Sequence, residues 1–243
     1  MSGQGEHMPQ EKVGRRAFLL AVGTAGAATQ VQAADPVAAT PKAAIAAPPP
    51  PPGYIFLKPA EAAFVEAVVN HMIPADELTP SGVDLGIAVF IDRALASGWG
   101  RGDRLYMHGP WKAGTPNQGY QLALTPAELY RAGISQANAW CRTAHGRGFD
   151  RLAADQKEAF LRALSKGAVT LPGGLPSQPF FEVVYQTVME GMFADPVYGG
   201  NRDKAAWRMI GFPGVMANNA ANVRVYSYGK RFPARPVSIA DMS

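Results

Sequence analysis

The chain has 243 residues, of which 47% are hydrophobic, and it carries a formal net charge of +4. This composition excludes an intrinsically disordered chain, and the lack of a long apolar run excludes a transmembrane protein. The mild basic excess forms no Lys/Arg cluster, so nucleic-acid binding is not expected. The single cysteine, Cys141, excludes an internal disulfide, a Cys-rich zinc site and a c-type haem attachment motif.

The N-terminus has the pattern of a twin-arginine export signal. Arg15 and Arg16 are followed by Phe18, Leu19 and an Ala/Gly-rich apolar run that is too short to span a bilayer. Small residues up to Ala33 suit cleavage nearby, which predicts a signal peptide over residues 1–33. Because this pathway carries proteins that have already folded, we expect a periplasmic protein that folds before export.

Residues 34–53 are predicted to be a linker. The segment is rich in Ala and Pro and ends in five consecutive prolines, Pro48 to Pro52. Such a run favours an extended polyproline II helix. It suits either a spacer between signal and domain or a ligand for an aromatic groove.

Residues 54–243 are predicted to form one compact all-α domain with long ordered loops. Apolar residues recur at helical spacing, and proline or glycine marks most of the ends. The expected helices cover residues 59–72, 84–97, 126–145, 153–166 and 177–192. Thr125-Pro126-Ala127-Glu128 has the pattern of a capping box at the start of the third. No convincing run of residues alternates between apolar and polar as β-strands do.

The loop-rich stretch from Gly98 to Leu124 is a candidate partner surface. Its aromatic residues are interleaved with glycine and proline, and loops of this length are usually functional or packed against something. Exposed aromatics on long loops mark interfaces more often than chemistry. The candidates are Trp99, Tyr106, Trp111 and Tyr120.

A second candidate surface follows the last long helix. Residues 195–203 read as an ordered loop, with Asp203 expected to cap a short helix that contains Trp207. Tyr, Arg and Trp are favoured anchors at interfaces, which makes Tyr198, Arg202 and Trp207 candidates to face a partner. A purely structural loop is the alternative, and so is a cation site built from Asp195, Asn201 and Asp203.

Four further residues have a structural and a functional interpretation. Cys141 is either a small buried residue or, as an odd cysteine in an oxidising compartment, half of an intersubunit disulfide. His71 lies near a helix C-terminus, where a bonded or cationic histidine is favoured over a catalytic one. The adjacent acids Asp76 and Glu77 could be paired glycosidase carboxylates, although neighbouring loop residues rarely point together.

Common catalytic motifs are missing from the sequence. We find no GxSxG elbow, P-loop, dinucleotide fingerprint or HExxH pair, and the four histidines are scattered. No catalytic, cofactor-binding or metal-binding residue is therefore predicted in this chain.

The densest segment, Glu190-Gly191-Met192-Phe193-Ala194-Asp195-Pro196-Val197-Tyr198-Gly199-Gly200-Asn201, carries a family resemblance. With the weaker stretches Ile73-Pro74 and Phe90-Ile91-Asp92, it resembles the small (gamma) subunit of membrane-bound gluconate 2-dehydrogenase, often called subunit 3. The resemblance extends over about residues 54–233. The twin-arginine signal followed by a variable linker is also similar to that family.

The resemblance implies a non-catalytic subunit of an oxidoreductase complex that oxidises a sugar or sugar acid. A catalytic flavoprotein of the glucose–methanol–choline type would hold FAD, with an iron–sulfur cluster as a further candidate. A multihaem cytochrome c would pass electrons to quinone, and this chain would reach the membrane only through its partners. The small subunit would support folding, stability and export of the flavoprotein. An independent secreted enzyme and a periplasmic binding or scaffold module are the alternatives.

Overall fold

The computed structural model describes residues 53–242, apart from residues 104, 113, 116, 117, 217, 219 and 234. The predicted export signal, including Arg15, Arg16, Phe18 and Leu19, and the linker up to Pro52 lie outside the described residues. Within the described part the chain is helical and has no β-strand. Its β-structure there is limited to an isolated bridge between Gly214 and Val237. The predicted all-α class is confirmed.

The helices are α2 (Pro59–Met72), α3 (Ile87–Ala96), α4 (Pro126–His145), α5 (Ala154–Ser165), α6 (Ser177–Phe193), α7 (Ala205–Ile210) and α8 (Ala220–Tyr226). Four 3-10 turns accompany them: η2 (Phe149–Arg151), η3 (Pro196–Tyr198), η4 (Arg202–Lys204) and η5 (Ile239–Met242).

Local sequence signals set most helix ends. The Thr125 hydroxyl accepts the Glu128 amide N–H, and the Glu128 carboxylate accepts the Thr125 amide N–H at 2.8 Å, which is the predicted capping box. At the other end of α4, Gly146 adopts a positive φ of 74° and stops the helix. Helix α2 begins at Pro59, where the missing N–H costs nothing.

Helix α3 begins three residues later than the sequence predicted. Residues 82–86 form a turn instead, and Gly86 has a φ of 80°, which a side chain would strain. A Cβ on Gly86 would lie 2.2 Å from the Gly199 carbonyl oxygen. Close packing of the 195–203 loop therefore sets the start of α3.

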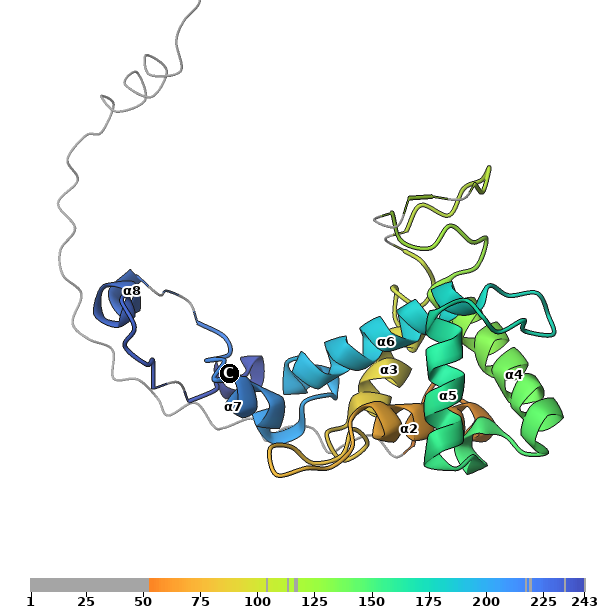
Figure 1. Ribbon diagram of the computed structural model, residues 1–243. Coiled ribbons are helices and arrows are strands. Elements are labelled where there is room, and N and C mark those ends of the chain that lie inside the picture. The colour runs from red at the N-terminus through yellow and green to blue at the C-terminus, as the bar shows by residue number, and fades with distance from the viewer. Residues whose placement is uncertain are drawn as a thin grey trace, which may run out of the picture. The chain divides into compact units, whose positions relative to one another are not determined.

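The core forms where α6 packs against α3, α4 and α5 (Figure 1). Four buried phenylalanine rings connect α2, η2, α5 and α6. The centroid separations are 4.9 Å for Phe64–Phe149, 5.8 Å for Phe149–Phe160 and 6.4 Å for Phe64–Phe180. Burial of such side chains contributes about 1.5–3 kcal/mol each, so this cluster is a main source of stability.

The 195–203 loop is fixed by side-chain bonds to backbone. The buried Asn201 amide donates to the Ala194 carbonyl at 3.0 Å and accepts the Ala206 N–H at 3.0 Å. Asn201, rather than the predicted Asp203, thus satisfies the start of α7; Asp203 has a φ of 57° and an exposed side chain. The Asp195 carboxylate accepts backbone N–H groups from Val197 and Ile239.

Trp207 belongs to the core. Only 4% of it is exposed, and its indole N–H donates to the Phe193 carbonyl at 2.8 Å. The prediction that it faces a partner is corrected, because the ring is used to seat α7 on α6. Among the described residues no helix has the length and apolar character needed to cross a membrane.

Candidate functional site

The loop over residues 98–124 and one face of α6 line a concave pocket with a volume of about 380 Å³. We call it the aromatic groove. All four aromatic side chains predicted as a partner surface line it: Trp99, Tyr106, Trp111 and Tyr120. The rest of its lining is Leu105, Met107, Gln118, Gly119, Gln121, Leu122, Pro126, Pro179, Glu182, Val183 and Gln186. Residues far apart in the sequence therefore meet in one site.

Exposure differs sharply within the aromatic groove. Tyr106 is 80% exposed and Leu105 is 40% exposed, whereas Trp99 and Tyr120 are half-buried and pack against the core. The inner aromatics hold the loop in place, and the outer residues remain open to a ligand. Large apolar side chains rimmed by polar groups are typical of interaction surfaces.

The polar side-chain groups of the aromatic groove are amides, one carboxylate, two phenols and two indole N–H groups. On α6, the Gln186 amide donates to Glu190 at 2.7 Å, and the Gln178 amide donates to Glu182 at 2.8 Å. Burial, then the negative charge of Glu128, raises the pKa of Tyr120 to about 12, and its hydroxyl donates to the Leu124 carbonyl at 3.2 Å. These donors and acceptors, with the Glu182 carboxylate among them, suit recognition of a protein surface.

The remaining predicted interface residues do not join the aromatic groove. Tyr198 is 56% exposed on η3, and Arg202 is exposed on η4, where its amide N–H donates to the Leu85 carbonyl at 2.9 Å. They are available to a partner at a separate place. Buried Trp207 is not.

Cys141 lies in α4 with none of its surface exposed. Burial raises the pKa of the thiol to about 12, so it is protonated near neutral pH. An intersubunit disulfide would require this sulfur to reach the surface. Its placement therefore favours the first interpretation, a small buried residue.

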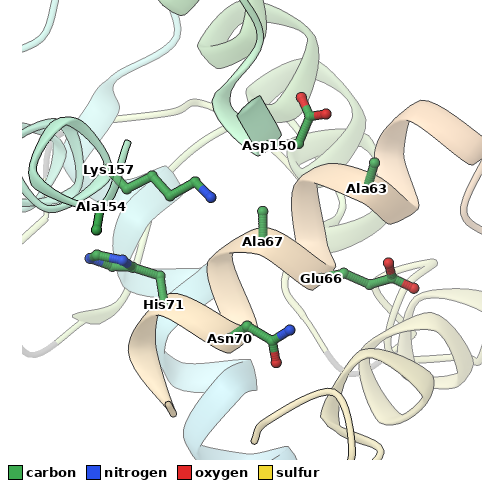
Figure 2. A pocket seen from close by; sticks show the side chains of 8 residues that line it. All are labelled: Ala63, Glu66, Ala67, Asn70, His71, Asp150, Ala154 and Lys157. Carbon is green, nitrogen blue, oxygen red and sulfur yellow. The ribbon is translucent and has the colours of Figure 1, made fainter. Parts of the chain in front are cut away.

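A second concavity, of about 450 Å³, lies between α2, η2 and α5 (Figure 2). Its lining includes the small residues Ala63, Ala67 and Ala154, and Figure 2 shows Lys157 extending toward Ala67. Glu66, Asn70, His71 and Asp150 complete the lining.

Several charged groups in or beside this second concavity form hydrogen bonds and ion pairs of the fold. His71 Nε2 lies 2.9 Å from a Glu158 carboxylate oxygen, and Arg162 lies 2.6 Å from the other oxygen. The bond to His71 lowers the pKa of Glu158. The Tyr54 hydroxyl donates to Glu66 at 2.5 Å, and burial, with this bond to a carboxylate, raises the pKa of Tyr54. His71 thus links α2 to α5, as expected of a bonded histidine at a helix end.

Asp76, one of the two adjacent acids predicted from the sequence, bonds to backbone. Asp76 accepts the amide N–H groups of Leu78 and Thr79, both at 2.8 Å, and these bonds lower its pKa. Its carboxylate therefore shapes a turn. Asp195 and Asn201 are likewise bonded to backbone, as described above. In the described part of the chain, no three His, Cys, Asp or Glu side chains are placed to hold a metal ion.

Comparison with known proteins places the chain in a family. The model of the family described as gluconate 2-dehydrogenase subunit 3 matches residues 59–214, which is more than half of the chain. No curated protein and no solved structure matches it. The matched range includes the core helices, the aromatic groove and the 195–203 loop, and it ends where the Gly214–Val237 bridge begins. The chain belongs to the gluconate 2-dehydrogenase subunit 3 family.

Proposed function

We propose that this chain is a non-catalytic small subunit that binds a catalytic flavoprotein of the glucose–methanol–choline type in the periplasm. The family supports its place as a subunit of a gluconate dehydrogenase complex. The aromatic groove is the observation that best supports docking of this chain on the flavoprotein, because Tyr106 and Leu105 are exposed there beside half-buried aromatic side chains. FAD, haem c and any iron–sulfur cluster would belong to the partners, and the cytochrome c subunit would provide attachment to the membrane.

The proposed mechanism is physical. Binding of this chain to the folded flavoprotein, and not to its unfolded form, stabilises the flavoprotein by linkage. A ligand at 100 times its Kd contributes about 2.7 kcal/mol in this way. Arg15 and Arg16 would then provide the export signal for both proteins, which explains a signal for folded cargo on a chain with no predicted cofactor site.

The aromatic groove makes the docking proposal testable by substitution. We expect a Leu105→Asp/Tyr106→Asp double variant to reduce the flavoprotein captured through this chain at least tenfold, because two charges would be buried against an apolar partner. Both side chains are exposed in the isolated chain, so its melting temperature should change little. The measurement is flavin absorbance of affinity-purified complex, normalised to this chain.

A matched control separates the groove from general surface charge. Leu78 and Tyr185 are 68% and 50% exposed and do not line the groove. The Leu78→Asp/Tyr185→Asp variant should therefore capture flavoprotein as well as the wild type. Equal loss in both double variants would show that the groove is not the docking surface.

A further inference from the structure

The C-terminal part of the chain leaves the helical domain and returns to it. The Val215 N–H donates to the Val237 carbonyl at 2.8 Å, and the Val237 N–H donates to the Pro213 carbonyl at 3.0 Å. Asp241, which follows Val237, has a carboxylate oxygen 2.5 Å from the Lys204 ammonium nitrogen. This bond, together with hydrogen bonds from Ser238, lowers the pKa of Asp241 to about 2. We call residues 216–236, between these anchored ends, the basic arm; α8 belongs to it (Figure 1).

Several apolar side chains of the basic arm are exposed. Helix α8 has no buried residue, with Val223 63% and Val225 52% exposed, and Tyr228 is fully exposed. Within the arm the Tyr226 and Phe232 rings pack against each other, with their centroids 4.9 Å apart. Long excursions with closed ends and little regular structure are usually functional, and exposed apolar patches mark interaction sites.

Charge on the basic arm has one sign. Residues 216–236 contain no Asp or Glu, and all four of their basic side chains are exposed: Arg224, Lys230, Arg231 and Arg235. Such a segment fits an anionic surface by electrostatic complementarity.

The arrangement of α8 favours a protein cleft over a membrane. Val223 and Val225 are two positions apart, or about 200° around the helix, with Arg224 between them. A helix that lies flat on lipid has its apolar residues on one side and its cations on the other. Apolar side chains on opposite sides of α8 instead suit an arm enclosed by a partner.

We propose that the basic arm inserts into an acidic, partly apolar cleft on the flavoprotein subunit. This inference rests on the proposed function for the existence of that partner. The arm lies beyond the family match, which ends at residue 214, so it would add a contact to the one made at the aromatic groove. Its cations would meet Asp and Glu side chains, and Val223, Val225 and Tyr228 would be buried.

The test uses the full chain, tagged after Ser243 and purified with its partners from its native host. We expect the variant Arg224→Glu/Lys230→Glu/Arg231→Glu to capture at least tenfold less flavoprotein near physiological salt, since like charges would now face each other. The control Lys58→Glu/Arg147→Glu/Lys166→Glu reverses three exposed charges outside the arm and should capture as much as the wild type.

Contact is located by a photo-crosslinking amino acid placed at Tyr228. We expect the crosslinked product to contain a flavoprotein peptide rich in Asp and Glu, identified by mass spectrometry. Flotation of the purified chain with phosphatidylglycerol vesicles tests lipid binding, and we expect the same weak signal from the wild type and the arm variant.

The outcomes distinguish this inference from the proposed function. If the Leu105→Asp/Tyr106→Asp variant loses the flavoprotein but the arm variant retains it, the arm inference is wrong and the proposed function stands. Vesicle binding that the arm variant abolishes, with crosslinks to lipid alone, would overturn the inference in favour of a membrane contact. If the wild-type chain captures no flavoprotein, the proposed function fails and the arm inference fails with it.

Discussion

Replacing Asp92 with alanine is expected to lower the free energy of unfolding by about 4 kcal/mol. Asp92 lies in α3 and is 2% exposed. One carboxylate oxygen accepts the N–H of Ile55 at 2.8 Å, and the other accepts those of Phe56 and Leu57 at 2.9 and 2.8 Å. A bond to a charged acceptor contributes about 1.5–3 kcal/mol, but the released segment regains hydration and freedom, so the loss is smaller than the sum.

Two companion variants and two measurements make the Asp92 prediction specific. Asp92→Asn keeps one acceptor oxygen and should cost about 2 kcal/mol, while Asp103→Ala removes an exposed ion pair with Arg101 and should cost less than 1 kcal/mol. Urea unfolding measures the free energies. Hydrogen exchange at residues 55–57 should become faster in Asp92→Ala; unchanged exchange there would refute the anchoring role.

The second large effect is expected at Gly133, where α4 crosses α6. A Cβ on Gly133 would lie 2.2 Å from two ring carbons of Phe180, which is itself 1% exposed and packed against Phe64. Overpacking of a core costs about 1–3 kcal/mol, whereas alanine gains up to about 1 kcal/mol in helix propensity. We therefore expect Gly133→Ala to lower the free energy of unfolding by a net amount of about 2 kcal/mol.

A double-mutant cycle identifies the cause of the Gly133 effect. Phe180→Leu opens a cavity and is destabilising alone, but it also makes room for the new methyl group. The double variant should then be at least about 1 kcal/mol more stable than the sum of the two single effects. Effects that add within about 0.5 kcal/mol would show that the clash with Phe180 is not the reason.

Most of the helical framework could be predicted from the sequence because local signals set it. Pro59, the Thr125 capping box and Gly146 act within a few residues, and the observed ends of α2 and α4 coincide with them. The start of α3 could not be predicted in this way. It depends on the approach of Gly199 to Gly86, more than a hundred residues apart.

The candidate site was predicted only in part, for the same reason. Composition of the 98–124 loop indicated its aromatic surface, but nothing local indicated that Pro179, Glu182, Val183 and Gln186 of α6 would complete the groove. Trp207 was misassigned because residue type alone does not distinguish an interface aromatic from a buried one. The two alanines that precede it were the available signal of a core helix in the sequence. In the structure both are buried.

The basic arm was missed altogether. Its helix, Ala220–Tyr226, is short and has no buried residue, and its exposed valines do not contribute to the core. The charge pattern was readable, since Arg224, Lys230, Arg231 and Arg235 follow one another without an intervening acid. Assigning these residues to one arm required the structure, in which backbone hydrogen bonds of Val215 and Val237 anchor both ends of the segment.

Co-expression tests the central claim, that this chain supports folding and export of a catalytic flavoprotein. The flavoprotein would be produced with the wild-type chain, with an Arg15→Lys/Arg16→Lys variant, and alone, and dehydrogenase activity would be measured in the periplasmic and cytoplasmic fractions. We predict periplasmic activity only with the wild-type chain, and folded but cytoplasmic flavoprotein with the twin-lysine variant. Full periplasmic activity of the flavoprotein produced alone would contradict the claim.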